Sequence, residues 1–270
     1  MPVSIGFFET SRACLQTRDP GGKCAQVQEF AAAAADGLVH WESGFPVEAI
    51  GTPGRPDRPR LVDASKVARR RPGSAEGRAA LVHAIAHIEF NAINLALDAA
   101  YRFRGMPEQY YLDWLSVADD ESRHFLLLRE RLREMGWDYG DFPAHNGLWE
   151  MAEKTADSCL KRMALVPRVL EARGLDVTPG MIQRLESAGD TGTVAALKVI
   201  LAEEVRHVAV GTEWFRYCCN EQNLEPLETF LGLLRDYYAG SLRGPFNLDA
   251  RYEAGFSVDE MEALTAGLAD

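Results

Sequence analysis

The most restrictive feature of this sequence is a Glu-x-x-His motif that occurs twice, each time within an apolar helical pattern. Glu121 and His124 form the first copy, in "ADDESRHFLLL", and Glu204 and His207 form the second, in "AEEVRHVAVG". Residues three apart lie on neighbouring turns of one helix face, so the Glu and the His of each copy can reach a common point. Each copy is therefore predicted to be a small chelate carried by a helix.

A further glutamate precedes each copy at nearly the same distance. In "HAIAHIEFNAINLALDAA" the only acid before Asp98 is Glu89, which lies 32 residues before Glu121. In "MALVPRVLEARG" the acid is Glu171, which lies 33 residues before Glu204. The matched separations predict two helical hairpins related by an approximate two-fold axis.

Helix bundles that bind two metal ions take one Glu from each of two helices and a Glu-x-x-His pair from each of the other two. The sequence supplies this complete donor set. The predicted metal ligands are Glu89, Glu121, His124, Glu171, Glu204 and His207. The alternative is that Glu89 and Glu171 are surface acids and that the histidines are structural. It is strongest for Glu171, because a kink at Pro167 leaves undecided which way the Glu171 side chain points.

The rest of the chain reads as helices separated by Pro and Gly, with little alternation of the kind that marks strands. Ser74 is the expected N-cap of the first long helix, and Gly174 the expected stop of the third. Residues 42–63 are rich in Pro and Gly, and we expect them to wrap around the bundle, anchored by the apolar residues Phe45, Val47, Ile50, Leu61 and Val62. Helices are predicted over residues 22–37, 75–103, 107–135, 148–173, 179–188, 191–220, 226–238 and 258–268.

These elements predict an all-α fold, a four-helix bundle with an N-terminal helix, an extended wrap and additional C-terminal helices. The predicted division places the N-terminal helix and wrap in residues 1–73, the bundle in residues 74–222 and the C-terminal helical extension in residues 223–270. All three are expected to pack into a single structural unit.

The motifs also carry a family resemblance. The glutamates and Glu-x-x-His pairs resemble those of the ferritin-like di-iron superfamily. The stretches "DDESRHFLLLRERLREMGWDYGDFPAHNGLWEMAEKT", "RMALVPRVLEARGLDVTPGM" and "EEVRHVAVG" are similar to the bacterial ferritin-like group called domain of unknown function 455, over about residues 20 to 240. The chain resembles the tRNA-modifying di-iron hydroxylases of the superfamily more remotely. The resemblance implies a ferritin-like bundle and the same six ligands.

The donor set fits two divalent metal ions, because four ionised carboxylates balance their charge while neutral imidazoles add donors without charge. Iron is the first expectation, with manganese or a mixed Mn/Fe pair as alternatives, since all three accept these ligands. We expect the metals to lie about 3.5 to 4 Å apart, with Glu121 and Glu204 bridging them. Glu89 with His124 would then hold one ion, and Glu171 with His207 the other.

Such a centre predicts an oxidoreductase, a non-haem di-iron oxidase or oxygenase, that activates dioxygen or peroxide on a substrate the sequence does not identify, with an electron donor as a further partner. Three alternatives stay open. One is a metal-handling or peroxide-protection protein without an organic substrate, another is a tRNA-modifying hydroxylase, and the third is a non-catalytic helical binding protein.

Charge and apolar runs restrict the partners. The formal net charge of −11 argues against nucleic acid, except tRNA under the hydroxylase alternative, and against anionic membranes. No apolar run approaches the roughly 20 residues of a membrane span, and the start resembles no signal peptide, so a cytoplasmic protein is expected. The five cysteines lack metal-site spacing and are expected to be free thiols. The long additions at both ends favour a monomer or dimer over a cage.

Four residues near the predicted ligands have open roles. His83 and His87 share a helix face, but His87 lies two positions from Glu89 and so points largely elsewhere, which favours a structural or supporting role. Arg123 and Arg206 stand beside the ligand histidines. They either orient ligands and pair between hairpins or form ordinary exposed salt bridges on their helices.

Overall fold

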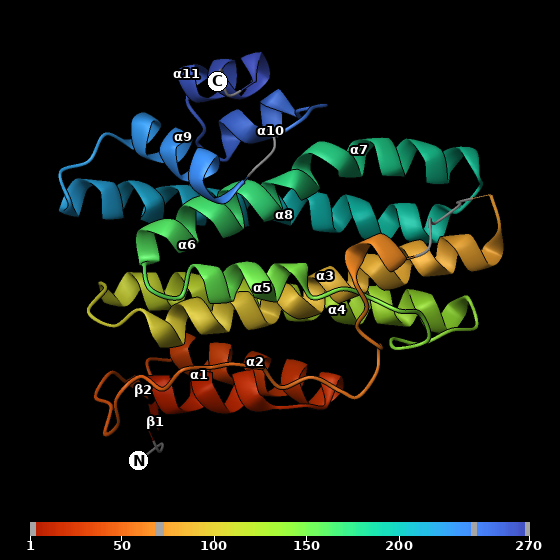
Figure 1. Ribbon diagram of the computed structural model, residues 1–270. Coiled ribbons are helices and arrows are strands. Elements are labelled where there is room, and N and C mark those ends of the chain that lie inside the picture. The colour runs from red at the N-terminus through yellow and green to blue at the C-terminus, as the bar shows by residue number, and fades with distance from the viewer. Residues whose placement is uncertain (1–3, 68–72, 239–241, 268–270) are drawn as a thin grey trace. The chain divides into compact units, whose positions relative to one another are not determined.

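The computed structural model describes residues 4–67, 73–238 and 242–267, and these residues are overwhelmingly helical (Figure 1). The predicted all-α fold is confirmed. The chain divides into two compact units, Met1–Glu153 and Lys154–Asp270, so that each predicted helical hairpin lies in its own unit. The boundaries predicted at residues 73 and 222 stay a prediction.

The first unit is built on a helical hairpin formed by α3 (Ala75–Arg102) and α4 (Glu108–Glu134). Two N-terminal helices, α1 (Phe7–Gln16) and α2 (Pro20–Ala35), cover this hairpin, with α1 against α3 and α2 against α4. The short strands β1 (Ile5–Gly6) and β2 (Val39–His40) pair in parallel beside them. The 3-10 turn η1 (Ala64–Lys66) precedes α3, and α5 (Gly147–Lys154) ends the unit. Four layered helices thus enclose the core of this unit.

Local signals explain where these helices begin. The Ser74 hydroxyl accepts a hydrogen bond from the Gly77 amide at 3.0 Å, which is the N-cap expected from the sequence. The Asp19 carboxylate caps α2 in the same way by accepting from the Gly22 amide at 2.6 Å. Helix α1 was not predicted. Its buried residues Phe7 and Leu15 lie in a stretch too short for its helical period to stand out.

The wrapping segment is ordered, as expected, but its anchors differ in part. Ile50 is buried, whereas Val47 is 38% exposed and anchors nothing. The segment is held largely through its backbone, because the Trp149 indole donates to the Gly51 carbonyl at 2.8 Å and the Gly54 amide donates to the Leu15 carbonyl at 2.8 Å. Such hydrogen bonds leave no apolar pattern in the sequence.

The second unit is built around α8 (Thr191–Glu221), which agrees closely with the predicted helix. Against it lies a composite helix made of α6 (Cys159–Leu165), the π-helical turn η2 (Val166–Glu171) and α7 (Ala172–Ser187). The C-terminal part adds α9 (Pro226–Tyr237), α10 (Leu248–Glu253) and α11 (Val258–Ala266). Helices α9 and α11 were predicted, and α10 was not.

The predicted helix over residues 148–173 begins where expected, with α5, but it is interrupted and its predicted end is wrong. The chain leaves the helix after Lys154 and begins a new one at Cys159, where the Ser158 hydroxyl accepts from the Lys161 amide. At the other end the helix continues through Gly174 and Pro179 to Ser187. The separate short helix predicted over residues 179–188 is therefore the last part of α7. Gly174, the expected helix stop, is itself helical and does not end the helix.

Among the described residues, one helix, Ala75–Arg102, is apolar and long enough to cross a membrane by length and composition. Of its most apolar window, 78% is buried inside the protein. This burial is typical of a core helix. The five cysteines are free, as expected.

A close approach between Pro167 and Gly211 joins η2 to α8. A methyl group built on Gly211 would lie 2.3 Å from both Cβ and Cγ of Pro167, so only glycine fits at this point. Proline removes a backbone N–H and its ring clashes with the carbonyl four residues earlier, which opens the helix locally. The wider turn and the missing side chain at Gly211 together let the two helices touch.

We expect Gly211→Ala to lower the free energy of unfolding by about 1–3 kcal/mol, because the added methyl overpacks a contact with a rigid ring. The measurement is urea denaturation of the purified variant. Gly174→Ala is the matched control, since that helical glycine has open space around it. Alanine there should be neutral or stabilising by up to about 1 kcal/mol. Equal stability of the two variants would contradict the role of the contact.

Candidate metal centre

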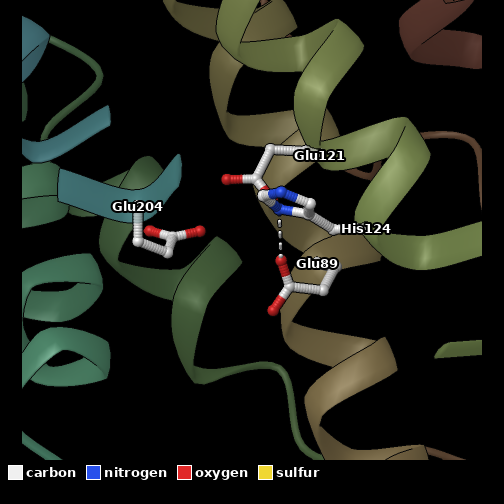
Figure 2. A group of neighbouring side chains, drawn as sticks. All are labelled: Glu89, Glu121, His124 and Glu204. Carbon is white, nitrogen blue, oxygen red and sulfur yellow. Dashed lines mark hydrogen bonds and ion pairs between the residues drawn. The ribbon is translucent and has the colours of Figure 1, made fainter. Parts of the chain in front are cut away.

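Three of the predicted ligands come together in the first unit. Glu89 projects from α3, and Glu121 and His124 project from one face of α4. His124 Nδ1 lies 3.3 Å from Glu121 Oε2 and 3.4 Å from Glu89 Oε2. Figure 2 shows the three side chains turned toward one another; Glu204, also drawn, belongs to the second unit. We call Glu89, Glu121 and His124 the α3–α4 half-site.

Burial gives the α3–α4 half-site unusual electrostatics. None of its three residues is more than 4% exposed. Burial by itself would lower the pKa of His124, but hydrogen bonds and charge from Glu121 and Glu89 outweigh it and raise that pKa to about 11. In the metal-free protein the imidazole therefore holds a proton and acts as the cation between two carboxylates. A metal ion bound there would replace that proton.

The second unit repeats the chelate on α8. His207 Nδ1 lies 3.4 Å from Glu204 Oε1, so the same ring nitrogen meets the same preceding glutamate as in the first unit. His207 is fully buried, and Glu204 is 9% exposed. Glu171, also 9% exposed, is the last residue of η2, which packs on α8. We call Glu171, Glu204 and His207 the η2–α8 half-site.

The π-helical turn explains how Glu171 is presented. Gly211 lies seven residues after Glu204 and four after His207, so it shares their face of α8. The Pro167–Gly211 contact therefore brings η2 against the face that carries the chelate. Turns of this kind occur mostly as single interruptions of α-helices and often at functional sites. The kink expected at Pro167 is thus a π-helical turn that ends on a predicted ligand.

A buried arginine fixes η2 from the opposite direction. Arg168 is fully buried and its guanidinium forms an ion pair with Glu260 at 2.5 Å. The side chain also lies over three phenylalanine rings, with its guanidinium carbon 4.1 Å from the Phe230 centroid and 4.6 Å from those of Phe215 and Phe256. Because Arg168 is three residues before Glu171, the C-terminal helix α11 is tied directly to the turn that carries a predicted ligand.

The two histidines of α3 that precede Glu89 have structural roles. His83 Nε2 accepts a hydrogen bond from the Gly140 amide at 3.0 Å. His87 Nδ1 lies 2.8 Å from the Tyr139 hydroxyl and His87 Nε2 lies 3.1 Å from the His145 carbonyl. Burial lowers the pKa of His87 to about 4, so this ring is neutral. Both residues hold the connection between α4 and α5 against the hairpin.

The arginines beside the predicted ligand histidines lie at the surface. Arg123 is exposed and pairs with Asp120 within α4, as in an ordinary helix salt bridge. Arg206 is exposed as well. The alternative in which Arg123 orients a ligand gains no support from this contact.

Sequence reasoning missed the residues that shape the η2–α8 half-site. Pro167 was recognised as a kink, but Gly211 and Arg168 were not singled out. A glycine within an apolar helix, four residues after a predicted ligand histidine, is a usable signal of close helix contact. For Arg168 the sequence offers no signal, because its partner Glu260 lies 92 residues away.

The donor set fits a divalent cation. One ligand atom from each of Glu89, Glu121 and His124 lies within 4.8 Å of the others, and all three residues are buried. Carboxylate oxygens and imidazole nitrogens are ligands that suit divalent iron, manganese and zinc rather than soft metals. This buried acidic and histidine group could therefore hold a metal ion.

Comparisons with known proteins agree with the resemblance to the group called domain of unknown function 455. The family described as Protein of unknown function (DUF455) matches residues 16–262. An "Uncharacterized protein" of Haemophilus influenzae is 42% identical over 267 residues, which cover 95% of this chain and 92% of that protein. No solved structure shows a significant match to the chain.

In metal-free protein, we expect His124→Gln to be strongly destabilising near about pH 6 and progressively less so toward about pH 9. The folded chain keeps the His124 proton up to a pKa of about 11, whereas the unfolded chain loses it near 6.5. The stability that the proton contributes is therefore complete below pH 6.5 and declines as the pH rises toward 11. Urea unfolding of both proteins with EDTA at several pH values measures the difference. A difference that grew with pH would contradict this charge assignment.

We expect Glu260→Gln to lower the free energy of unfolding by about 3 kcal/mol, because it leaves the buried Arg168 charge without its counter-ion. Chemical denaturation measures the change. Glu186→Gln is the matched control, since the Glu186–Lys198 pair is exposed and its loss should cost at most about 0.5 kcal/mol. Similar costs for the two variants would show that Arg168 does not depend on Glu260.

Proposed function

The chain belongs to the family described as Protein of unknown function (DUF455), and we propose that it is a metalloprotein whose two half-sites form one carboxylate-bridged dinuclear centre. The ligands proposed are Glu89, Glu121, His124, Glu171, Glu204 and His207. The observation that carries the proposal is the repeated chelate, in which a buried His Nδ1 meets the carboxylate three residues before it in each unit.

Charge balance supports two divalent ions. Four carboxylates carry four negative charges when ionised, and two divalent cations neutralise them with both imidazoles uncharged. Without metal, the negative charge of Glu121 and Glu89 holds a proton at the site, as the raised pKa of His124 indicates. Iron is the metal we propose, with manganese or a mixed pair as alternatives that accept the same donors.

The matched halves suggest distinct roles for the ligands. Glu121 and Glu204 are the equivalent first residues of the two chelates, and we assign them as bridges. Glu89 with His124 would hold one ion, and Glu171 with His207 the other. Each imidazole must act as a neutral donor, so His124 has to release its proton when metal binds.

The function we propose is that of an oxidoreductase of the ferritin-like superfamily that activates dioxygen or peroxide. When bound, an iron pair supplies electrons and open coordination positions for oxygen chemistry. The chain contributes the carboxylates that balance the changing metal charge and the apolar packing that keeps bulk water from the buried donors. Phe90 and Phe125, whose ring centroids lie 5.3 Å apart, pack against each other between α3 and α4.

Metal counting on purified variants tests the assignment. Under the proposal, the unaltered chain binds two metal ions. Glu121→Ala and Glu204→Ala should lower occupancy at both positions, because each removes a shared charge. His124→Ala and His207→Ala should mainly weaken one position, because the remaining carboxylates still attract a cation. Glu130→Ala is the matched control, since that residue is an exposed glutamate of α4.

Two metals retained in Glu204→Ala would exclude the bridging role, and full retention in all six single ligand variants would exclude the site. For the activity, anaerobic loading with Fe(II) followed by air should change the visible and Mössbauer spectra of the loaded protein. Absence of dioxygen and peroxide consumption with every reductant tried would leave metal binding standing and exclude the oxidoreductase.

A further inference from the structure

A wide pocket lies in the first unit, in the wrapping segment and away from the predicted ligands. Its volume is about 590 Å³, and it is lined by residues 52–57 and 59–61 together with Gln16 and Arg18. This volume is within the usual range for small-molecule sites, roughly 300–1,000 Å³. Three arginines, Arg18, Arg55 and Arg60, contribute to the wall, against one acid, Asp57.

The charge of this pocket is opposite to that of the protein. The chain carries 29 basic and 40 acidic residues, for a formal net charge of −11, yet the pocket wall has an excess of two positive charges. Guanidinium groups present planar pairs of N–H donors that match carboxylate and phosphate oxygens. A concave wall concentrates such a field better than a flat surface does.

The arginines are carried by a fixed loop. The Arg18 Nε donates to the Arg55 carbonyl at 3.2 Å, and Arg55 Nη1 donates to Asn146 Oδ1 at 3.2 Å. The Ala144 amide donates to the Arg60 carbonyl at 3.1 Å. A side chain on Gly54 would lie 2.2 Å from the Gln16 carbonyl oxygen, so the loop sits directly on the end of α1. Little ordering would be required of the backbone on binding.

One of these arginines already binds an anionic group. Arg18 Nη2 lies 2.5 Å from Asp57 Oδ1, although the Asp57 side chain is 92% exposed. An ion pair this exposed contributes little to stability, so exchange for a stronger anion is not costly. The Asp57 carboxylate occupies the kind of position that a phosphate oxygen of a ligand would take.

We propose that this pocket binds a phosphorylated small molecule, with Arg18, Arg55 and Arg60 contacting its phosphate groups. The pocket is larger than one phosphate ion, so a ligand of up to nucleotide size is accommodated. The confined set of three arginines favours a small ligand over a nucleic-acid backbone, which requires an extended basic surface and would be repelled by the acidic remainder. The proposal is independent of the metal centre.

Isothermal titration with pyrophosphate, at low and at physiological salt, tests the site. Binding to the full-length protein is expected, and Arg60→Gln and Arg55→Gln should each weaken it about three- to tenfold. Asp57→Asn should strengthen it by a similar factor, because it removes a competing negative charge. Arg184→Gln makes the same charge change at an exposed position of α7, outside the pocket, and should leave the affinity unchanged.

The sign of the Asp57→Asn effect separates binding at this pocket from misfolding, since a damaged loop cannot bind more tightly. The Arg184→Gln control separates it from general electrostatics, because that variant loses the same charge outside the pocket. Arg60 is exposed, so Arg60→Gln is expected to fold even if Arg55→Gln does not. No pyrophosphate binding at low salt, or equal weakening by Arg60→Gln and Arg184→Gln, would overturn the proposal. Binding of a short RNA that ignores these substitutions, with none of pyrophosphate, would also overturn it.

Discussion

Two carboxylates buried side by side need a cation between them, and this requirement governs the centre of the first unit. Glu89 and Glu121 lie on different helices, α3 and α4, and both approach the Nδ1 atom of His124. The His124 proton supplies the cation when metal is absent. Packing alone would favour apolar residues at these positions, since a buried charge network is seldom more stable than a hydrophobic core. The retention of these charges in the interior therefore points to a binding role rather than to stability.

The second unit also brings a glutamate, Glu171, toward a Glu-x-x-His pair, but it does so with a different backbone geometry. Its glutamate is presented by a π-helical turn, because Pro167 cannot continue the α-helical hydrogen bonding and Gly211 admits the proline ring. The turn is then held by Arg168, whose buried charge is balanced by Glu260 of α11 and by three aromatic faces. The C-terminal helices thus stabilise the π-helical turn that carries Glu171.

Helices set by local sequence patterns were predicted more accurately than the segments that depend on tertiary contacts. Helices α3, α4 and α8 were predicted almost to the residue, because long apolar periodicity, the Ser74 cap and the chelate spacing all agree. The helix bearing Glu171 was misplaced, because Gly174 and Pro179 are usual helix stops and only tertiary packing keeps them helical. The predicted ligands came from the Glu-x-x-His spacing within single helices and from the matched separations that single out Glu89 and Glu171. The buried Arg168, the backbone anchors of the wrap and the arginine pocket depend on contacts between distant segments, which one sequence does not reveal.

Helix α3 separates the two candidate sites of the first unit. His87, Asn91 and Asn94 are spaced four and three residues apart, share one face and lie against the inner side of the wrapping segment. Glu89 is two residues from both His87 and Asn91, so it is turned roughly 200° away, toward α4. The acidic half-site and the basic pocket therefore occupy opposite sides of one helix. That separation is what an anion-binding pocket requires in this protein, because ionised carboxylates on the pocket side would repel its ligand and neutralise its arginines.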